Sequence, residues 1–328
     1  MEDKQMSLKI EVTNKKSKGF GGLVILLAAS LILFGSYQKA DAQQKTFKSP
    51  EEAVKSMMDA LKAHDTKELL TIFGPAGKDL ISSGDEVADR TTRERFVKDF
   101  EETNKLLRET DRKVTLIVGK EEWPFPIPIV KVGENWRFDT KAGKEELLNR
   151  QIGRNELDTI QVCLAIVDAQ REYALRNRGS GLYEYAQRFV STKGKKDGLY
   201  WKAKEGEEQS PLGPLAARAV MEGYSGKKSA GKPVPYHGYF YKMLKAQGKN
   251  APGGAYDYVV NGKMIGGFAL VAYPAEYGAS GVMTFIVNHD GVVYEKDLGK
   301  DTEKIASAMK KFDPDKTWEK VEDAKKPL

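Results

Sequence analysis

The 328-residue chain has little of the chemistry that metal sites and nucleophilic enzymes use. It contains one cysteine, Cys163, so no disulfide forms within the chain and its stability must come from the burial of apolar side chains. Its three histidines, His64, His237 and His289, are too widely spaced for a short zinc-binding motif. Its glycine pairs lack the strand and helix context of a nucleotide-binding loop. We therefore predict no metal, no cofactor and no catalytic residues.

The chain also lacks a block of charge of one sign. Its 53 Lys and Arg and 47 Asp and Glu give a net charge of +6, and the two signs are interleaved, as in residues 90–95. Proteins that bind nucleic acid usually gather their basic residues into a stripe or patch. Nucleic acid is therefore not an expected partner.

A mean hydropathy of −0.52 excludes a membrane protein with several spans. Near the N-terminus, a lysine-rich segment precedes an uncharged apolar run over residues 23–34, which Ala40-Asp41-Ala42 follows. A helix of that run would be about 18 Å long, shorter than the hydrocarbon core of a membrane, so the pattern is typical of a signal peptide. We expect cleavage of residues 1–42 after Ala42 and a periplasmic or extracellular protein. The alternative is that the segment stays uncleaved as a membrane anchor. If it is cleaved, the chain contacts the membrane only transiently, through the signal peptide. No cysteine follows the run, so no lipid attachment is predicted.

The next segment, residues 43–142, combines helices with strands. Ser49 and Asp65 are typical helix N-caps, and a third helix is predicted over residues 91–107. Apolar residues then alternate with a period of two, which predicts strands over residues 114–118, 127–132 and 136–139. Three helices before an antiparallel sheet resemble the cone-shaped, nuclear transport factor 2-like fold. We assign residues 43–142 to one such domain.

The remaining residues, 143–328, are assigned to a second domain that opens with a long helix over residues 143–174. Residues 168–174, 181–183 and 197–199 resemble the helix-to-loop passage of type IV pilins and pseudopilins. Strands are predicted over residues 239–244, 256–260, 268–273 and 282–287, with a hairpin turn over 288–291 and a helix over 303–311. The hydrophobic N-terminal pilin helix with its processing site is missing, which argues against filament assembly.

Three motifs carry a wider resemblance. Ser210-Pro211-Leu212-Gly213-Pro214-Leu215, Ala275-Glu276-Tyr277-Gly278 and residues 281–285 have the order and spacing of a bacterial family catalogued as domain of unknown function 2950. The chain resembles this family over residues 48–318. The resemblance implies an exported α+β protein and implies no activity.

Aromatic side chains are the main candidates for binding. Every tyrosine beyond residue 42 lies between Tyr173 and Tyr294. Strand alternation places Tyr239 with Tyr241, and Tyr256 with Tyr258, on one face, so these rings either offer a contact surface or cover a thin core. The candidate binding residues are His237, Tyr236, Tyr239, Tyr241, Tyr256, Tyr258, Tyr277, Trp123 and Trp136.

We predict a non-catalytic binding or envelope-assembly module whose partner is an envelope protein or glycan. One alternative is a hydrolase of an envelope polymer that uses His237 or His289 with a carboxylate. Another is a small-ligand carrier whose N-terminal cone is lined by aromatic residues, namely Phe96, Phe100, Trp123 and Trp136. Structural roles at helix ends are expected for His64, Asp301 and Asp313.

Overall fold

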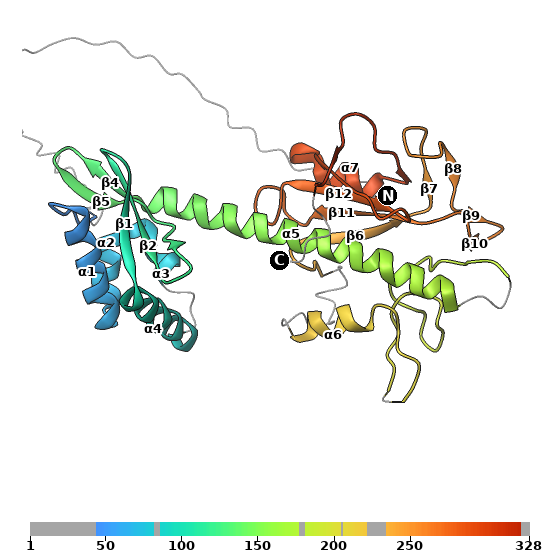
Figure 1. Ribbon diagram of the computed structural model, residues 1–328, viewed down its shortest axis with the longest axis horizontal. Coiled ribbons are helices and arrows are strands. Elements are labelled where there is room, and N and C mark those ends of the chain that lie inside the picture. Colours follow the sequence, from blue (N-terminus) through green and yellow to red (C-terminus); the bar gives the residue numbers. More distant parts are fainter. Residues whose placement is uncertain (1–43, 82–85, 177–180, 205, 222–233, 323–328) are drawn as a thin grey trace, which may run out of the picture. The chain divides into compact units, whose positions relative to one another are not determined.

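The computed structural model describes residues 44–81, 86–176, 181–204, 206–221 and 234–322 (Figure 1). These residues form helices and mainly antiparallel sheets, which confirms the predicted α+β class. The predicted signal peptide and its cleavage site lie outside the described residues. Within the described ranges, no helix combines the length and apolar character needed to cross a membrane.

The first helices begin where their caps predict. The Ser49 hydroxyl accepts a hydrogen bond from the backbone N–H of Glu52 and caps α1 (Pro50–Lys62). The Asp65 carboxylate accepts two such bonds and caps α2 (Thr66–Phe73). A short 3₁₀ turn, η1 (Pro75–Gly77), leads into α3 (Lys78–Ile81), and α4 spans Glu86–Glu102.

The helix predicted over residues 91–107 extends beyond the end of the observed helix. Helix α4 stops at Glu102, and β1 (Asn104–Thr110) follows it. The side-chain amide of Asn104 donates to the Phe100 carbonyl near the end of the helix, and β1 gains a full antiparallel ladder with β2 (Lys113–Val118). This non-local pairing overrides the local helical pattern.

The first sheet has the order β1-β2-β4-β5, where β4 is Ile129–Val132 and β5 is Asn135–Phe138. The two-residue strand β3 (Trp123–Pro124) pairs with β2 off this path, as expected for a proline-containing segment. The sheet and α1 to α3 enclose a hydrophobic cluster that includes Met57, Ile72 and Phe138. We call residues 44–139 the N-terminal lobe.

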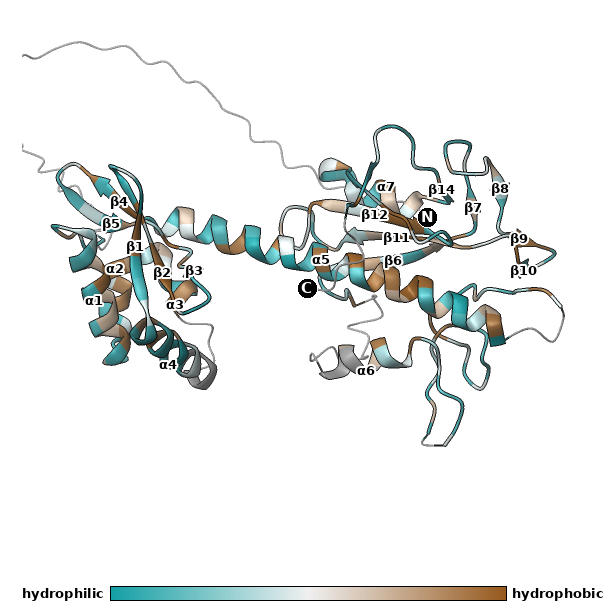
Figure 2. Ribbon diagram, in the orientation of Figure 1, coloured by the Kyte–Doolittle hydropathy of each residue, from teal (hydrophilic) through white to brown (hydrophobic). Residues whose placement is uncertain are grey.

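Helix α5 (Thr140–Arg176) is the predicted long helix. At its start, the Thr140 hydroxyl donates to the Phe73 carbonyl at 2.6 Å, and Gly143 leaves room for Ile127. Hydrophobic residues line its second half (Figure 2), where Cys163 is fully buried. Burial raises the pKa of the Cys163 thiol, and the residue packs as a small core side chain.

The main sheet of the second half has the order β15-β13-β12-β11-β6 and is antiparallel. Its strands are β6 (Tyr239–Leu244), β11 (Ala269–Pro274), β12 (Met283–Asn288), β13 (Val293–Asp297) and β15 (Glu319–Lys320). The predicted hairpin turn joins β12 to β13: Gly291 has φ +77° and its N–H donates to the Asn288 carbonyl.

Shorter elements complete this half. A small sheet joins β7 (Ala246–Gln247), β8 (Tyr256–Asp257) and β14 (Lys311–Phe312), while β9 (Val259–Val260) pairs with β10 (Lys263–Met264). The predicted strand over residues 256–260 is therefore two strands. Helix α7 (Thr302–Ala308) packs against β11, and α6 (Gly213–Met221) is a short helix in the segment between α5 and β6. Helix α7 ends earlier than predicted because Lys311 enters β14.

A second hydrophobic cluster, separate from the first, fills this half and includes Cys163, Tyr239, Phe268 and Phe285. We call residues 181–322 with the second half of α5 the C-terminal lobe. The predicted boundary between the two domains, at residues 142 and 143, falls inside α5. The division of the chain into these two domains stays a prediction.

Candidate functional site

An apolar pocket of about 310 Å³ opens in the N-terminal lobe. Helices α1 to α4, the residues around β3 and the start of α5 all contribute to its wall. Leu69, Phe96, Trp123, Phe125 and Leu147 are among the side chains that line it. Its volume is at the lower end of the range of small-molecule sites, and an apolar lining is typical of them.

Three aromatic rings form one side of this pocket. The centroids of Phe96 and Phe125 are 5.4 Å apart, and Trp123 lies 6.4 Å from Phe96 and 6.3 Å from Phe125. Trp123 is 43% exposed, and the Arg150 guanidinium lies 5.4 Å from its ring centroid. The indole of Trp123 is thus available both to solvent and to a bound molecule.

Arg93 is the charged residue of the described lining. Its guanidinium donates to the Ile81 carbonyl at 2.5 Å, a bond that uses one of its five N–H donors. The pocket therefore combines an apolar interior with one cation in its wall.

Two of the four aromatic residues expected to line a cone contribute to this pocket, namely Phe96 and Trp123. Trp136 is instead buried on β5, where it is 6% exposed. Phe100 packs against the hydrophobic cluster of the N-terminal lobe. Trp136 therefore packs in the hydrophobic cluster of the N-terminal lobe.

The strand tyrosines do not form an exposed face. Tyr239 and Tyr258 are fully buried, and their hydroxyls donate to the Met283 carbonyl and to the Gln247 side chain at 2.9 Å each. Tyr241 donates to the Thr159 hydroxyl on α5. Burial raises the pKa of all three phenols. Tyr239, Tyr241 and Tyr258 therefore cover the core and do not form a contact surface.

The other candidate tyrosines are scattered. Tyr256 is 38% exposed and stacks edge-on against Tyr258. The Tyr277 hydroxyl donates to Asp297 at 3.2 Å. Tyr236 packs against the imidazole of His237 in a tilted arrangement, with 4.1 Å between ring centroids.

His237 meets a carboxylate. Its Nδ1 lies 3.2 Å from Oδ2 of Asp158 on α5, and its backbone adopts the left-handed conformation with φ +48°. Its side chain is 13% exposed. The nearby Ser280 hydroxyl accepts a hydrogen bond from the Glu276 N–H and donates one to the Glu276 carbonyl. Both bonds lie within the turn that contains Ser280. His237 and Asp158 therefore form an oriented imidazole–carboxylate pair.

His289 and His64 have looser partners. His289 packs against Tyr258 and Phe268, and its Nε2 is 3.8 Å from Asp290, beyond hydrogen-bond distance. His64 follows the end of α1, as expected, 3.9 Å from Glu94. Neither is held by a hydrogen-bonded carboxylate in these contacts.

The acidic residues near the C-terminus serve turns. The Asp313 carboxylate accepts the Asn250 N–H at 2.8 Å and so joins two loops, in place of the predicted helix cap. Asp301 occupies the N-cap position of α7 without a side-chain hydrogen bond. Across the described ranges, no group of three His, Cys, Asp or Glu side chains is arranged to hold a metal ion.

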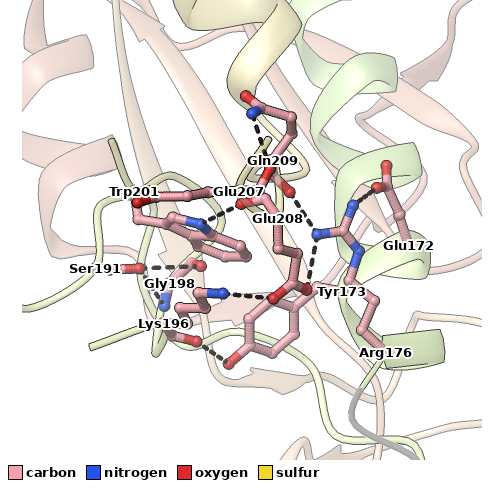
Figure 3. Close-up of polar contacts among 10 residues, drawn as sticks. All are labelled: Glu172, Tyr173, Arg176, Ser191, Lys196, Gly198, Trp201, Glu207, Glu208 and Gln209. Atoms are coloured by element: carbon pink, nitrogen blue, oxygen red, sulfur yellow. Dashed lines mark hydrogen bonds and ion pairs between the residues drawn. The ribbon is translucent and has the colours of Figure 1, made fainter. Parts of the chain in front are cut away.

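One polar cluster was missed by the sequence reasoning (Figure 3). Arg176, at the end of α5, pairs with Glu172 and Glu208 and donates to the Gln209 carbonyl. Glu208 also pairs with Lys196 at 2.5 Å, and the Trp201 indole donates to the Glu208 carbonyl. The signal in the sequence was a local one: four lysines between residues 193 and 202, next to Tyr200-Trp201.

Comparison with known proteins gives one positive finding. The model of a family described as protein of unknown function (DUF2950) matches residues 44–321. Searches of curated proteins and of solved structures give no match. The resemblances to the nuclear transport factor 2-like fold and to pilins stay predictions.

Proposed function

Because the chain belongs to the DUF2950 family, whose description names no activity, its function has to be inferred from its sites, and we propose a non-catalytic binding protein. We place its ligand in the apolar pocket of the N-terminal lobe. Such a protein is both a binding module and a small-ligand carrier, two roles that the sequence predicts.

The observation that carries the proposal is the aromatic wall of Phe96, Trp123 and Phe125 around an open volume of about 310 Å³. An open apolar volume forfeits packing energy that a filled core would gain. A ligand that fills it recovers this energy.

Arg93 selects the chemistry of the ligand. An apolar molecule with a carboxylate gains burial of its chain and a charge-assisted hydrogen bond to the guanidinium. The proposed ligand is therefore a small apolar acid, such as a medium-chain fatty acid.

Tryptophan fluorescence, to which Trp123 contributes as one of four tryptophans, provides the test. Titration of the purified chain with dodecanoate is expected to give a saturable change. Leu147→Phe places a larger side chain in the pocket and is expected to weaken the binding of dodecanoate roughly tenfold.

The matched control is Leu157→Phe, because Leu157 lies on the same helix, is 45% exposed and does not line the pocket. This variant is expected to bind like the wild type. The proposal fails if the wild type shows no saturable change, or if Leu147→Phe binds as well as Leu157→Phe.

We propose that the protein works outside the cytoplasm, in contact with an envelope protein or glycan. The apolar run over residues 23–34 supports this address. Mass spectrometry of the protein from its natural cells is expected to find Gln43 as the first residue. A full-length chain in the cytoplasm would contradict the address.

The pair of His237 and Asp158 favours a second function, the hydrolysis of an envelope polymer. A carboxylate on Nδ1 orients an imidazole to act as a general base toward water. The purified chain would then release soluble fragments from isolated peptidoglycan, and His237→Gln would abolish this while His64→Gln would not. Absence of release by the wild type rules this function out.

A further inference from the structure

A lysine-rich groove of about 680 Å³ lies on the segment that follows α5. Its lining includes four lysines, Lys193, Lys195, Lys196 and Lys202, together with the aromatic residues Tyr200 and Trp201. None of these residues lines the apolar pocket of the N-terminal lobe. The groove is thus a site of its own.

The charge of this groove is not balanced. Lys193, Lys195 and Lys202 are exposed, and none of them has an ion pair among the described residues. Glu208 is neutralised, because Lys196 and Arg176 both pair with it and hold the pKa of its carboxyl below the ordinary value. Three cations and one carboxylate, that of Glu207, therefore face solvent here, and the groove keeps a positive charge.

The segment that presents these cations is held in place at many points. The Tyr173 hydroxyl donates to the Lys196 carbonyl at 3.1 Å, and Asp197 accepts bonds from both the N–H and the hydroxyl of Thr192. The Trp201 indole is fixed by its bond to the Glu208 carbonyl (Figure 3). A surface segment that is ordered before binding loses less entropy when a ligand arrives.

We propose that this groove binds an anionic glycan. A sugar ring packs against Trp201, whose flat apolar face suits the C–H face of a pyranose, and the acidic groups of the chain pair with Lys193, Lys195 and Lys202. Glu207, which also lines the groove, accepts hydrogen bonds from sugar hydroxyls. A DNA backbone has no free sugar hydroxyl to donate to this carboxylate, which favours a glycan over DNA.

Titration calorimetry of the purified chain tests this assignment with defined probes. These are three anionic glycans that carry carboxylates (oligogalacturonate), sulfates (dextran sulfate) or phosphodiesters (a teichoic acid fragment), with maltooligosaccharide, polyglutamate and single-stranded DNA for comparison. At least one anionic glycan is expected to bind, and the triple variant K193Q/K195Q/K202Q is expected to bind it roughly tenfold more weakly. Trp201→Phe keeps a ring and is expected to stay within about threefold of the wild type, whereas Trp201→Ala loses roughly tenfold.

The matched control is K98Q/K300Q/K304Q, which removes three exposed lysines outside the groove and changes the net charge equally. It is expected to bind like the wild type, and thermal melting checks that every variant is folded. The assignment is overturned if no anionic glycan binds, or if the control loses as much affinity as the groove variant. It is also overturned if polyglutamate or DNA binds as tightly as the best glycan.

Discussion

One cluster of aromatic residues in each lobe is packed differently from the other. In the C-terminal lobe, Tyr239, Tyr258, Phe268 and Phe285 are each at most 1% exposed. In the N-terminal lobe, Phe96 and Phe125 are partly buried around an open pocket, and Trp123 is 43% exposed. The difference teaches that the packing of the aromatic rings, and not their number, decides whether a pocket remains open in a lobe.

Truncation of one aromatic residue in each lobe should separate these roles most strongly. Phe285→Ala removes a fully buried ring and is expected to lower the free energy of unfolding by about 4 kcal/mol. Trp123→Ala is expected to lower the free energy of unfolding by about 1 kcal/mol, because this side chain is already 43% exposed. The same substitution is expected to weaken ligand binding. Urea denaturation measures both. Equal losses of stability would remove the contrast between the lobes.

A smaller effect is expected from adding one methyl group to the dense core. A Cβ on Gly281 would lie 2.1 Å from the Tyr239 hydroxyl oxygen and 2.5 Å from its ring, so Gly281→Ala should cost about 3 kcal/mol. Gly153→Ala in α5 meets nothing within 4 Å and should stabilise the chain by about 1 kcal/mol. Thermal melting of the two variants should move in opposite directions. A tolerated Gly281→Ala would show that the core around Tyr239 is loosely packed.

Helix caps give a further comparison between the lobes. Ser49→Ala removes the hydrogen bond to the N–H of Glu52 and is expected to cost about 1 kcal/mol. Asp301 makes no cap bond at the start of α7, so Asp301→Ala should change the free energy of unfolding by no more than about 0.3 kcal/mol. A larger loss for Asp301→Ala in the same denaturation assay would mean that its carboxylate does cap α7 in solution.

The smallest expected effects concern pH. Hydrogen bonds from Lys113 and Thr115 lower the pKa of Glu109 in the N-terminal lobe, so its carboxylate stabilises the fold above its ordinary pKa and this contribution is lost as pH falls through the lowered value. Burial, with Glu156 and Glu319 nearby, raises the pKa of Glu295 in the C-terminal lobe, so its ionisation costs stability as pH rises through the raised value.

Glu109→Gln should therefore destabilise and Glu295→Gln should stabilise the chain at neutral pH, by about 0.5 kcal/mol each after solvent screening. Both differences should shrink as pH falls, and the Glu109 difference should persist to lower pH because the pKa of its carboxyl is lowered. Denaturation curves at pH 7 and pH 3 measure this. A shift of the same sign in both variants would contradict the assigned environments.

Three local features were predicted correctly from the sequence, whereas the cap predicted at Asp313 was not. Ser49, Asp65 and the Asn288–Gly291 turn each act through hydrogen bonds to adjacent backbone, and the structure has them as predicted. Strand β1 was missed because its stability comes from pairing with β2, which the local pattern does not contain.

The candidate sites were harder to predict. A period of two places Tyr239 and Tyr241 on one face without saying whether a helix covers that face, and α5 covers it through Thr159. Phe96 and Trp123 were identified, but the pocket also depends on Leu69 and Leu147, which are far apart in the chain. The lysine-rich groove was not predicted, because the net charge of the whole chain does not reveal a local cluster of lysines.

The most direct measurement of the central claim, that the N-terminal lobe holds an apolar ligand, is a nuclear magnetic resonance titration of the isotope-labelled chain with dodecanoate. The account predicts saturable shifts at Phe96, Trp123 and Leu147 and unchanged signals at Phe285. Shifts confined to the C-terminal lobe, or no shifts at saturating ligand, would contradict it.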